Sequence, residues 1–153
     1  MKSLSVLNKL KEKHFKIAFA ESMTGGALVS ELIKNPSASS VLELGMVTYS
    51  NRIKESFLDV PKEVIEKYGV VSKEVSIIMA KNMKAKAHSH ISVSVTGNAG
   101  PTSSLNSNVG EVWVSICILE KVMSYYFKFE NLERKEIINK TVNKVYEILD
   151  KLL

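Results

Sequence analysis

Short runs of apolar and β-branched residues alternate with segments in which apolar residues recur every three or four positions. The runs predict strands and the recurring spacing predicts amphipathic helices. The expected strands cover residues 15–20, 41–49, 91–96, 111–119 and 122–129. Helical segments separate the first three strands, whereas only Glu120 and Lys121 separate the last two, which indicates a hairpin. We therefore expect an α/β fold, a three-layer sandwich with a mixed, partly parallel sheet covered by helices and an antiparallel edge hairpin.

Residues with defined capping chemistry mark the ends of the expected helices. Ser50 and Ser72 are predicted N-caps, because a serine hydroxyl accepts a hydrogen bond from the free N–H groups of a helix start. Pro61 is predicted to start a helix and Gly69 to end it. Gly25–Gly26 is predicted to open another helix, because glycine lets the backbone turn sharply.

Composition narrows the class of protein. No apolar run is long enough to span a bilayer, and the N-terminus lacks a secretion signal, so we expect a cytoplasmic single domain over residues 1–153 with no membrane partner. The net charge of +5 fits an anionic ligand or a lysine-rich helix face, but aromatic residues do not interleave with the lysines as nucleic-acid binding would require. Cys117 lies in an expected strand and is interpreted as a buried structural cysteine. No metal site is expected from His14, His88 and His90, which lack a credible ligand set.

Three polar segments follow three of the expected strands. They cover residues 20–26 (Ala-Glu-Ser-Met-Thr-Gly-Gly), 48–54 (Thr-Tyr-Ser-Asn-Arg-Ile-Lys) and 94–101 (Ser-Val-Thr-Gly-Asn-Ala-Gly-Pro). In open α/β sheets the ligand crevice lies outside the carboxyl ends of the strands. Parallel pairing would bring all three segments to one edge of the sheet, where we expect the functional site.

Ser22 is a candidate nucleophile in the first of these segments. It stands just before Gly25–Gly26, so its hydroxyl would face the start of the following helix. Free N–H groups at that start could hold an anion or a developing oxyanion. The structural alternative is that Ser22 or Thr24 merely caps the helix.

Lys54 is a candidate base in the second segment. It lies four residues after the expected cap Ser50, so its side chain would lean back toward Tyr49. The positive helix end and burial would both disfavour the protonated amine. The alternative is an ordinary surface lysine.

The third segment offers a turn that can approach a ligand through its backbone. Its candidate binding residues are Thr96, Gly97, Asn98 and Gly100. The alternative is a flexible connection into the hairpin.

In this order, the segments resemble the C-terminal domain of the CinA (competence- and damage-inducible protein) family, whose stand-alone members include nicotinamide-nucleotide amidases. The resemblance covers nearly the whole chain. It is carried by Ala20-Glu21-Ser22, Thr24-Gly25-Gly26, Val47-Thr48-Tyr49-Ser50-Asn51, Lys54, Gly69, Val71-Ser72, Ser94, Thr96-Gly97, Ala99-Gly100-Pro101 and Val109-Gly110.

The resemblance implies hydrolysis of nicotinamide mononucleotide to nicotinate mononucleotide and ammonia. It implies that Ser22 attacks the amide, that Lys54 takes the serine proton, and that the Tyr49 hydroxyl donates a hydrogen bond to one of them. No metal or cofactor is needed, and the expected partners are the nucleotide substrate and further copies of the chain, with a dimer favoured. The implied substrate-binding residues are Thr24, Gly25, Gly26, Thr96, Gly97, Asn98, Gly100 and Arg134.

Two stretches depart from the family pattern. Residues 102–108 (Thr-Ser-Ser-Leu-Asn-Ser-Asn) replace a glycine pair and a Lys-Pro. Arg134 matches one of two arginines that the family often shows, and Ile137 or Ile138 takes the place of the other. These departures favour, as an alternative, a non-catalytic or altered-substrate nucleotide-binding member of the family. A nucleic-acid-associated protein ranks last, because no recognisable nucleic-acid motif is present.

Overall fold

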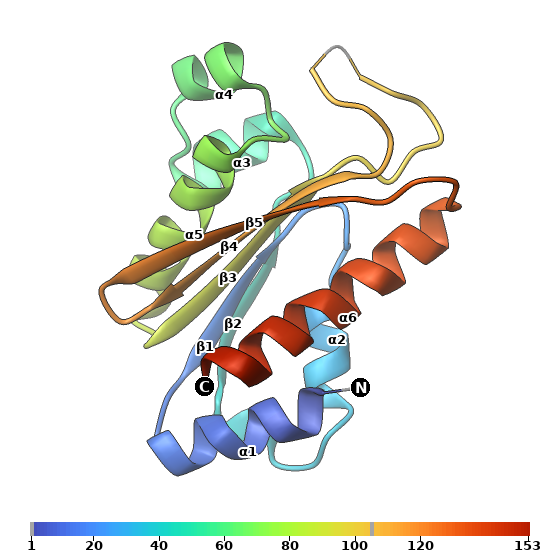
Figure 1. Ribbon diagram of the computed structural model, residues 1–153. Helices are drawn as coiled ribbons and strands as arrows, with labels where there is room; N and C mark the ends of the chain where they lie inside the picture. Colours follow the sequence, from blue (N-terminus) through green and yellow to red (C-terminus); the bar gives the residue numbers. More distant parts are fainter. Residues whose placement is uncertain (1, 105) are drawn as a thin grey trace.

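A five-stranded mixed sheet forms the centre of the computed structural model, which describes residues 2–104 and 106–153 (Figure 1). The strand order is β2-β1-β3-β4-β5. The strands are β1 (Ile17–Glu21), β2 (Leu42–Val47), β3 (Ile91–Gly97), β4 (Glu111–Ile118) and β5 (Lys121–Lys128). The first three run parallel and the last two pair antiparallel at one edge. The predicted α/β fold with a partly parallel sheet and an edge hairpin is confirmed.

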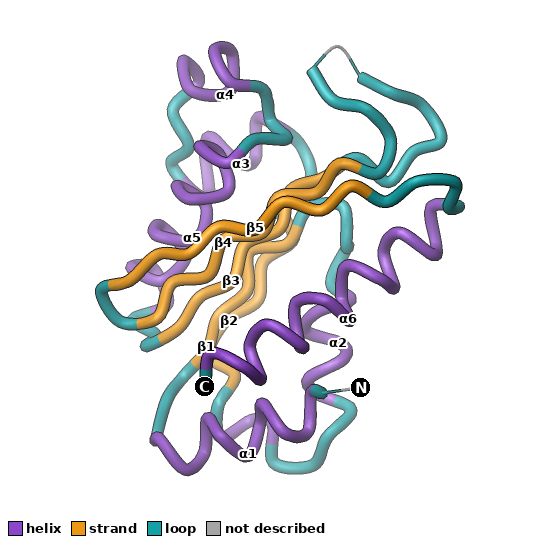
Figure 2. Tube along the Cα trace, viewed as in Figure 1, coloured by secondary structure: helices purple, strands orange, loops and turns teal. Residues whose placement is uncertain are grey.

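Helices cover both faces of this sheet (Figure 2). They are α1 (Ser3–Lys13), α2 (Ala27–Ile33), α3 (Asn51–Leu58), α4 (Lys62–Tyr68), α5 (Lys73–Ala87) and α6 (Arg134–Leu152). Helices α1, α2 and α6 lie on one face and α3, α4 and α5 on the other. A short 3-10 helix, Ala38–Ser40, lies between α2 and β2. In the described ranges, no helix is long and apolar enough to cross a membrane.

The predicted caps are present. The Ser50 hydroxyl accepts a hydrogen bond from Ile53 N at 3.2 Å, and the Ser72 hydroxyl accepts one from Val75 N at 3.2 Å. Gly69 ends α4 with a φ of 83°, a conformation that favours glycine. These caps define where α3 and α5 begin and where α4 ends.

Strand β1 is buried on both faces, because its alternate side chains enter two different apolar cores. Ile17 and Phe19 pack with α1, α2 and α6, whereas Ala18 and Ala20 pack with α3, α4 and α5. Full burial of one large apolar side chain contributes about 1.5–3 kcal/mol. The strand that leads into Ser22 is therefore held firmly in the centre of the sheet.

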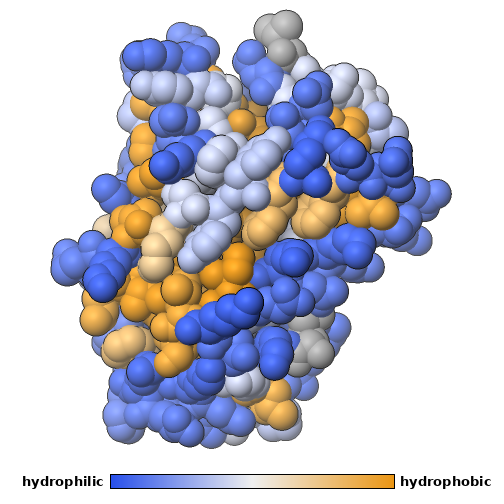
Figure 3. Space-filling model, viewed as in Figure 1, coloured by the Kyte–Doolittle hydropathy of each residue, from blue (hydrophilic) through white to orange (hydrophobic). Residues whose placement is uncertain are grey.

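The register brings the polar segments to one edge, as predicted. Glu21 lies opposite Val47 on β2, and Ala20 lies opposite Ser94 on β3. The chain continues from these pairs into the three segments described above. Elsewhere, the face drawn in Figure 3 is mainly hydrophilic, with apolar surface gathered near the turn between β4 and β5.

Candidate active site

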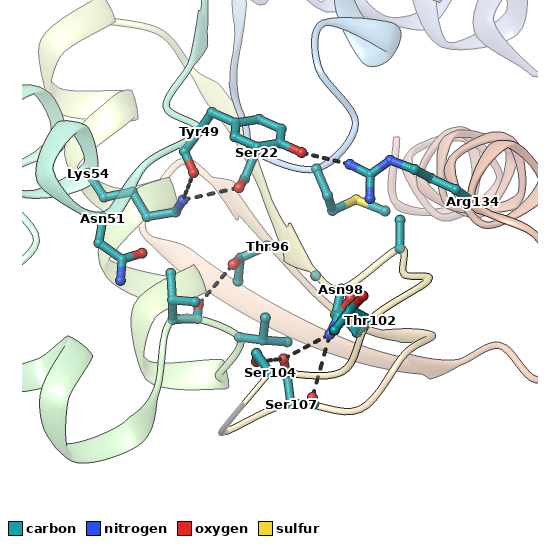
Figure 4. A pocket seen from close by; sticks show the side chains of 15 residues that line it. Ser22, Tyr49, Asn51, Lys54, Thr96, Asn98, Thr102, Ser104, Ser107 and Arg134 are labelled. Carbon is teal, nitrogen blue, oxygen red and sulfur yellow. Dashed lines mark hydrogen bonds between the residues drawn. The ribbon is translucent and has the colours of Figure 1, made fainter.

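A cavity of about 230 Å³ lies at the carboxyl edge of the parallel strands. All three polar segments reach it, together with the α4–α5 turn, the loop after β3 and the first residue of α6 (Figure 4). Its lining residues are Ser22, Met23, Tyr49, Asn51, Lys54, Val70, Val71, Thr96, Gly97, Asn98, Ala99, Thr102, Ser104, Ser107 and Arg134.

Ser22 and Lys54 are in direct contact at this cavity. Lys54 Nζ lies 3.0 Å from Ser22 Oγ, and both residues are buried, with exposed fractions of 1% for Lys54 and 7% for Ser22. Nζ also donates to the carbonyls of Thr48 at 2.8 Å and Tyr49 at 3.2 Å. A neutral amine has two N–H donors and one lone pair. Those two carbonyls can take the donors while the lone pair accepts the Ser22 hydroxyl proton.

Burial changes the protonation of Lys54. Removal of the charged amine from water lowers the pKa of Lys54 from 10.5 to about 8. The lysine is on the first turn of α3, where its N–H bonds back to Ser50 O at 3.0 Å and its side chain leans toward the helix start. The prediction that the Lys54 side chain leans back toward Tyr49 is confirmed. Because its pKa is about 8, the amine can lose a proton near neutral pH.

The start of α2 differs from the prediction, because the Glu21 carboxylate already occupies it. The N–H groups of Gly26, Leu28 and Val29 donate to that carboxylate at 2.9–3.2 Å, as does the Thr24 hydroxyl at 2.7 Å. The expectation that this helix start offers free N–H groups to a ligand is therefore wrong.

The remaining turn amides are used in a similar way. Gly25 N donates to Ser22 O and Ala27 N donates to Thr24 O, each at 3.0 Å. Neither Thr24, Gly25 nor Gly26 lines the cavity. Within the described residues, the N–H groups of Met23 and Thr24 have no hydrogen-bond partner, so these two amides stay available beside Ser22.

Tyr49 also differs from the prediction. Its hydroxyl accepts a hydrogen bond from Arg134 Nη2 at 2.6 Å and makes none to Ser22 or Lys54 (Figure 4). Tyr49 is bonded to Lys54 only through its main-chain carbonyl. Tyr49 is 58% exposed, and its ring extends over the cavity toward Arg134 of α6. Arg134 Nη1 donates to Gly100 O at 2.6 Å. One guanidinium thus joins the segment after β2 to the loop after β3.

The side chains of the third segment are engaged mainly with the protein. Thr96 Oγ1 donates to Val70 O at 2.8 Å. Asn98 Nδ2 donates to Thr102 O at 3.2 Å and to Ser107 Oγ at 3.3 Å, so Asn98 holds the loop that follows it. Gly97 reaches the cavity with its backbone, and a Cβ there would lie 3.0 Å from the Glu111 carbonyl oxygen. Gly100 contributes its carbonyl to Arg134 and does not line the cavity.

Comparison with known proteins places these features in a family. The model of the CinA C-terminal domain matches residues 2–153. The chain belongs to this family. A competence-damage inducible protein of Clostridium acetobutylicum is 42% identical over 137 residues, which are 89% of this chain and 33% of that protein. One from Alkaliphilus oremlandii is 47% identical over 108 residues, 70% of this chain and 26% of that protein. The chain thus spans about a third or less of these relatives.

Solved CinA-family structures share the fold over nearly their full length. The competence/damage inducible protein CihA of Agrobacterium tumefaciens superposes with a TM-score of 0.94 at 28% identity, covering 99% of this chain and 93% of that chain. A competence or damage-inducible protein of Enterobacter asburiae gives 0.95 at 25% identity, covering 99% and 96%. These names state no reaction, so the chemistry rests on the site itself.

Several cavity residues of this CinA domain escaped sequence reasoning. Asn51 lies within the second polar segment, so the segment was a usable signal for it. Val70 and Val71 come from the α4–α5 turn and carry no polar signal. Residues 102–108, marked in the sequence by their departure from the family pattern, contribute Thr102, Ser104 and Ser107 to the cavity wall.

Other reactive residues of the CinA domain lie apart from the cavity. Cys117 is buried, as predicted, and burial raises the pKa of its thiol, which disfavours the thiolate. In the described part of the chain, no three His, Cys, Asp or Glu side chains are grouped as a metal ion would require. Ser22 and Lys54 are the candidate nucleophile and base that the fold brings into contact.

Proposed function

We propose that this CinA-family chain is an amidase that hydrolyses nicotinamide mononucleotide to nicotinate mononucleotide and ammonia. The observation that carries the proposal is the 3.0 Å contact between Lys54 Nζ and Ser22 Oγ, both buried beside a cavity. A nucleophile within hydrogen-bond distance of a base with a lowered pKa is the general arrangement of covalent hydrolases. Family membership supports the choice of substrate.

In the first half-reaction, Ser22 Oγ attacks the amide carbon while neutral Lys54 accepts the hydroxyl proton. The tetrahedral oxyanion forms, the carbon–nitrogen bond breaks, and Lys54 returns the proton to the departing ammonia. The electron-withdrawing pyridinium ring makes the amide carbon more susceptible to attack. In the second half-reaction, water attacks the acyl-enzyme and Lys54 takes a proton from that water. The bond between the acyl carbon and Ser22 Oγ then breaks, and Lys54 returns the proton to Oγ.

The oxyanion requires hydrogen-bond donors close to Ser22. Met23 and Thr24 offer main-chain N–H groups directly after the nucleophile, whereas the amides at the start of α2 are bonded to Glu21. We assign the oxyanion site to the Met23 amide, because Met23 lines the cavity whereas Thr24 does not. Removal of one such donor typically costs about 10²–10³-fold in kcat.

The rest of the cavity suits a flat ring and an anion. Met23, Val70 and Val71 supply apolar surface for the pyridine ring. Arg134 is the cation for the phosphate, since its guanidinium is bonded only to the neutral oxygens of Tyr49 and Gly100 among the described residues. Of the described lining residues, none carries a carboxylate that would repel an anion.

The direct test is ammonia release from nicotinamide mononucleotide by the wild type and Ser22→Ala. We expect the variant to lose about 10³-fold or more in kcat, since the nucleophile is gone, while its circular dichroism spectrum and melting temperature stay close to the wild type. Near-normal ammonia release by Ser22→Ala would contradict the mechanism.

A related amide substrate is the second candidate. Thr102, Ser104 and Ser107 give the cavity wall hydroxyl groups where the family pattern has glycines and a lysine. Such a wall offers hydrogen bonds but no second cation for a phosphate. Ammonia release from nicotinamide riboside that matches the release from the mononucleotide would favour this candidate.

A further inference from the structure

The Glu21 carboxylate is completely buried, with 0% of the residue exposed, and stands directly before Ser22. Its Oε1 accepts from Thr24 Oγ1 at 2.7 Å, Gly26 N at 3.2 Å and Leu28 N at 2.9 Å, and its Oε2 accepts from Val29 N at 3.1 Å. A buried carboxylate is costly unless hydrogen bonds compensate it. These four donors and the positive end of α2 supply that compensation.

The main chain of Glu21 is linked to Lys54 through Thr48. Its carbonyl accepts a hydrogen bond from Thr48 N at 2.8 Å. The Thr48 carbonyl in turn accepts from Lys54 Nζ at 2.8 Å. The side chain of Glu21 is thus bonded to the start of α2, and its backbone is bonded to the segment that holds Lys54. Ser22 follows Glu21 directly, so both sets of hydrogen bonds restrict its position.

We propose that Glu21 is a positioning residue whose carboxylate closes the turn from Ser22 to Gly26 and so keeps the Ser22 hydroxyl against Lys54. Glu21 does not line the cavity, so it acts through Ser22 and not on the substrate. The inference rests on the proposed function only in taking Ser22 as the nucleophile. Gly25 and Gly26 contribute no side-chain contact to this turn, so the side-chain hydrogen bonds that close it come from Glu21.

Glu31 provides a matched control on the same helix. It is also buried, with 8% exposed, and its carboxylate accepts from Ser3 Oγ at 3.0 Å and Lys34 Nζ at 2.9 Å. These contacts are at the far end of α2 from Ser22. Glu31→Gln therefore removes a second buried carboxylate from the same helix without disturbing the turn.

The experiment measures how fast a fluorophosphonate probe labels Ser22, followed by intact mass. Ser22 Oγ attacks phosphorus, fluoride leaves, and Lys54 takes the proton, so the readout does not depend on the natural substrate. We expect Glu21→Gln and Thr24→Val to lower the labelling rate constant by about 10–100-fold, the cost of a small misplacement of reacting groups. Thr24→Ser, which retains the hydroxyl, should restore most of the rate, and Glu31→Gln should stay within about twofold of the wild type.

The rate constant separates positioning from folding. A residue that only stabilises the fold would lower the fraction of chain that reacts, measured as the final labelled amount, and leave the rate constant of the folded fraction unchanged. That result for Glu21→Gln, or a wild-type rate for Thr24→Val, overturns the proposal. Thr24→Val keeps the carboxylate and decides the question if Glu21→Gln does not fold.

The same assay distinguishes this failure from failure of the proposed function. If wild-type Ser22 is labelled and the variants match it, only the positioning role is lost. If wild-type Ser22 is neither labelled nor able to release ammonia from nicotinamide mononucleotide, the nucleophile itself is wrong and Glu21 has nothing to position.

Discussion

The two walls of the cavity are built in different ways. On one side Ser22 and Lys54 are buried, and each makes a hydrogen bond within its own segment, Ser22 O with Gly25 N and Lys54 Nζ with Thr48 O. On the other side Thr102 and Ser104 are exposed, and the loop is held by Asn98 and by contacts among its serines. The first wall has little freedom to change without loss of the reactive pair. The second can change sequence at small cost to the fold, so we assign chemistry to the first wall and substrate recognition to the second.

Lys54→Arg should give the largest effect and is the sharpest test of the buried wall. We expect kcat to fall about 10²–10³-fold, because arginine keeps the positive charge but does not accept a proton near neutral pH. Lys54→Met, which lacks the charge, should be equally inactive in the ammonia assay. Substantial activity in Lys54→Arg alone would make the side chain an electrostatic anchor and not a base.

The pH dependence of the wild type tests the same wall without substitution. Burial lowers the pKa of Lys54 to about 8, so the neutral amine gains population as pH rises and dominates above that value. We expect kcat/KM to increase about tenfold per pH unit below the midpoint and to level off above it. A profile that is flat from pH 6 to 8, with chemistry rate-limiting, would contradict the role of the amine.

Arg134→Gln probes the junction between the walls. The variant retains a donor for the Tyr49 hydroxyl or the Gly100 carbonyl but loses the charge that we assign to the phosphate. We expect KM for nicotinamide mononucleotide to rise about tenfold with a smaller change in kcat, because this contact is remote from the amide and partly uniform between ground and transition states. Equal KM values for mononucleotide and riboside in the wild type would remove Arg134 from phosphate binding.

A change in residues 102–108 should give the smallest effect. Introducing a glycine pair and a Lys-Pro, as the family pattern has them, adds a cation and backbone freedom to the exposed wall. We expect KM for the mononucleotide to fall a few-fold with kcat nearly unchanged. As a control, Lys135→Gln removes a charge from an exposed position of α6 that does not line the cavity, and it should leave both constants unchanged. A fall in kcat in the loop variant would mean that the two walls are coupled, against the division drawn above.

Local sequence patterns determined the elements of this protein and the edge where its site lies. Apolar periodicity and the caps Ser50, Ser72 and Gly69 act over a few residues, so their structural outcome could be predicted without knowing the fold. The order of strands and helices then brought the three polar segments together. The lean of Lys54 toward Tyr49 followed from helix geometry alone.

The partners of individual polar groups depended on the tertiary structure. Glu21 lies on a strand, and the way the turn after β1 folds back brings the start of α2 to its carboxylate, which takes the N–H groups expected for a ligand. Tyr49 and Arg134 are far apart in the chain, and the approach of α6 decides that they meet. Hydrogen bonds between distant segments leave no periodic trace in the sequence, because each depends on the final position of two elements and not on the spacing of neighbouring residues.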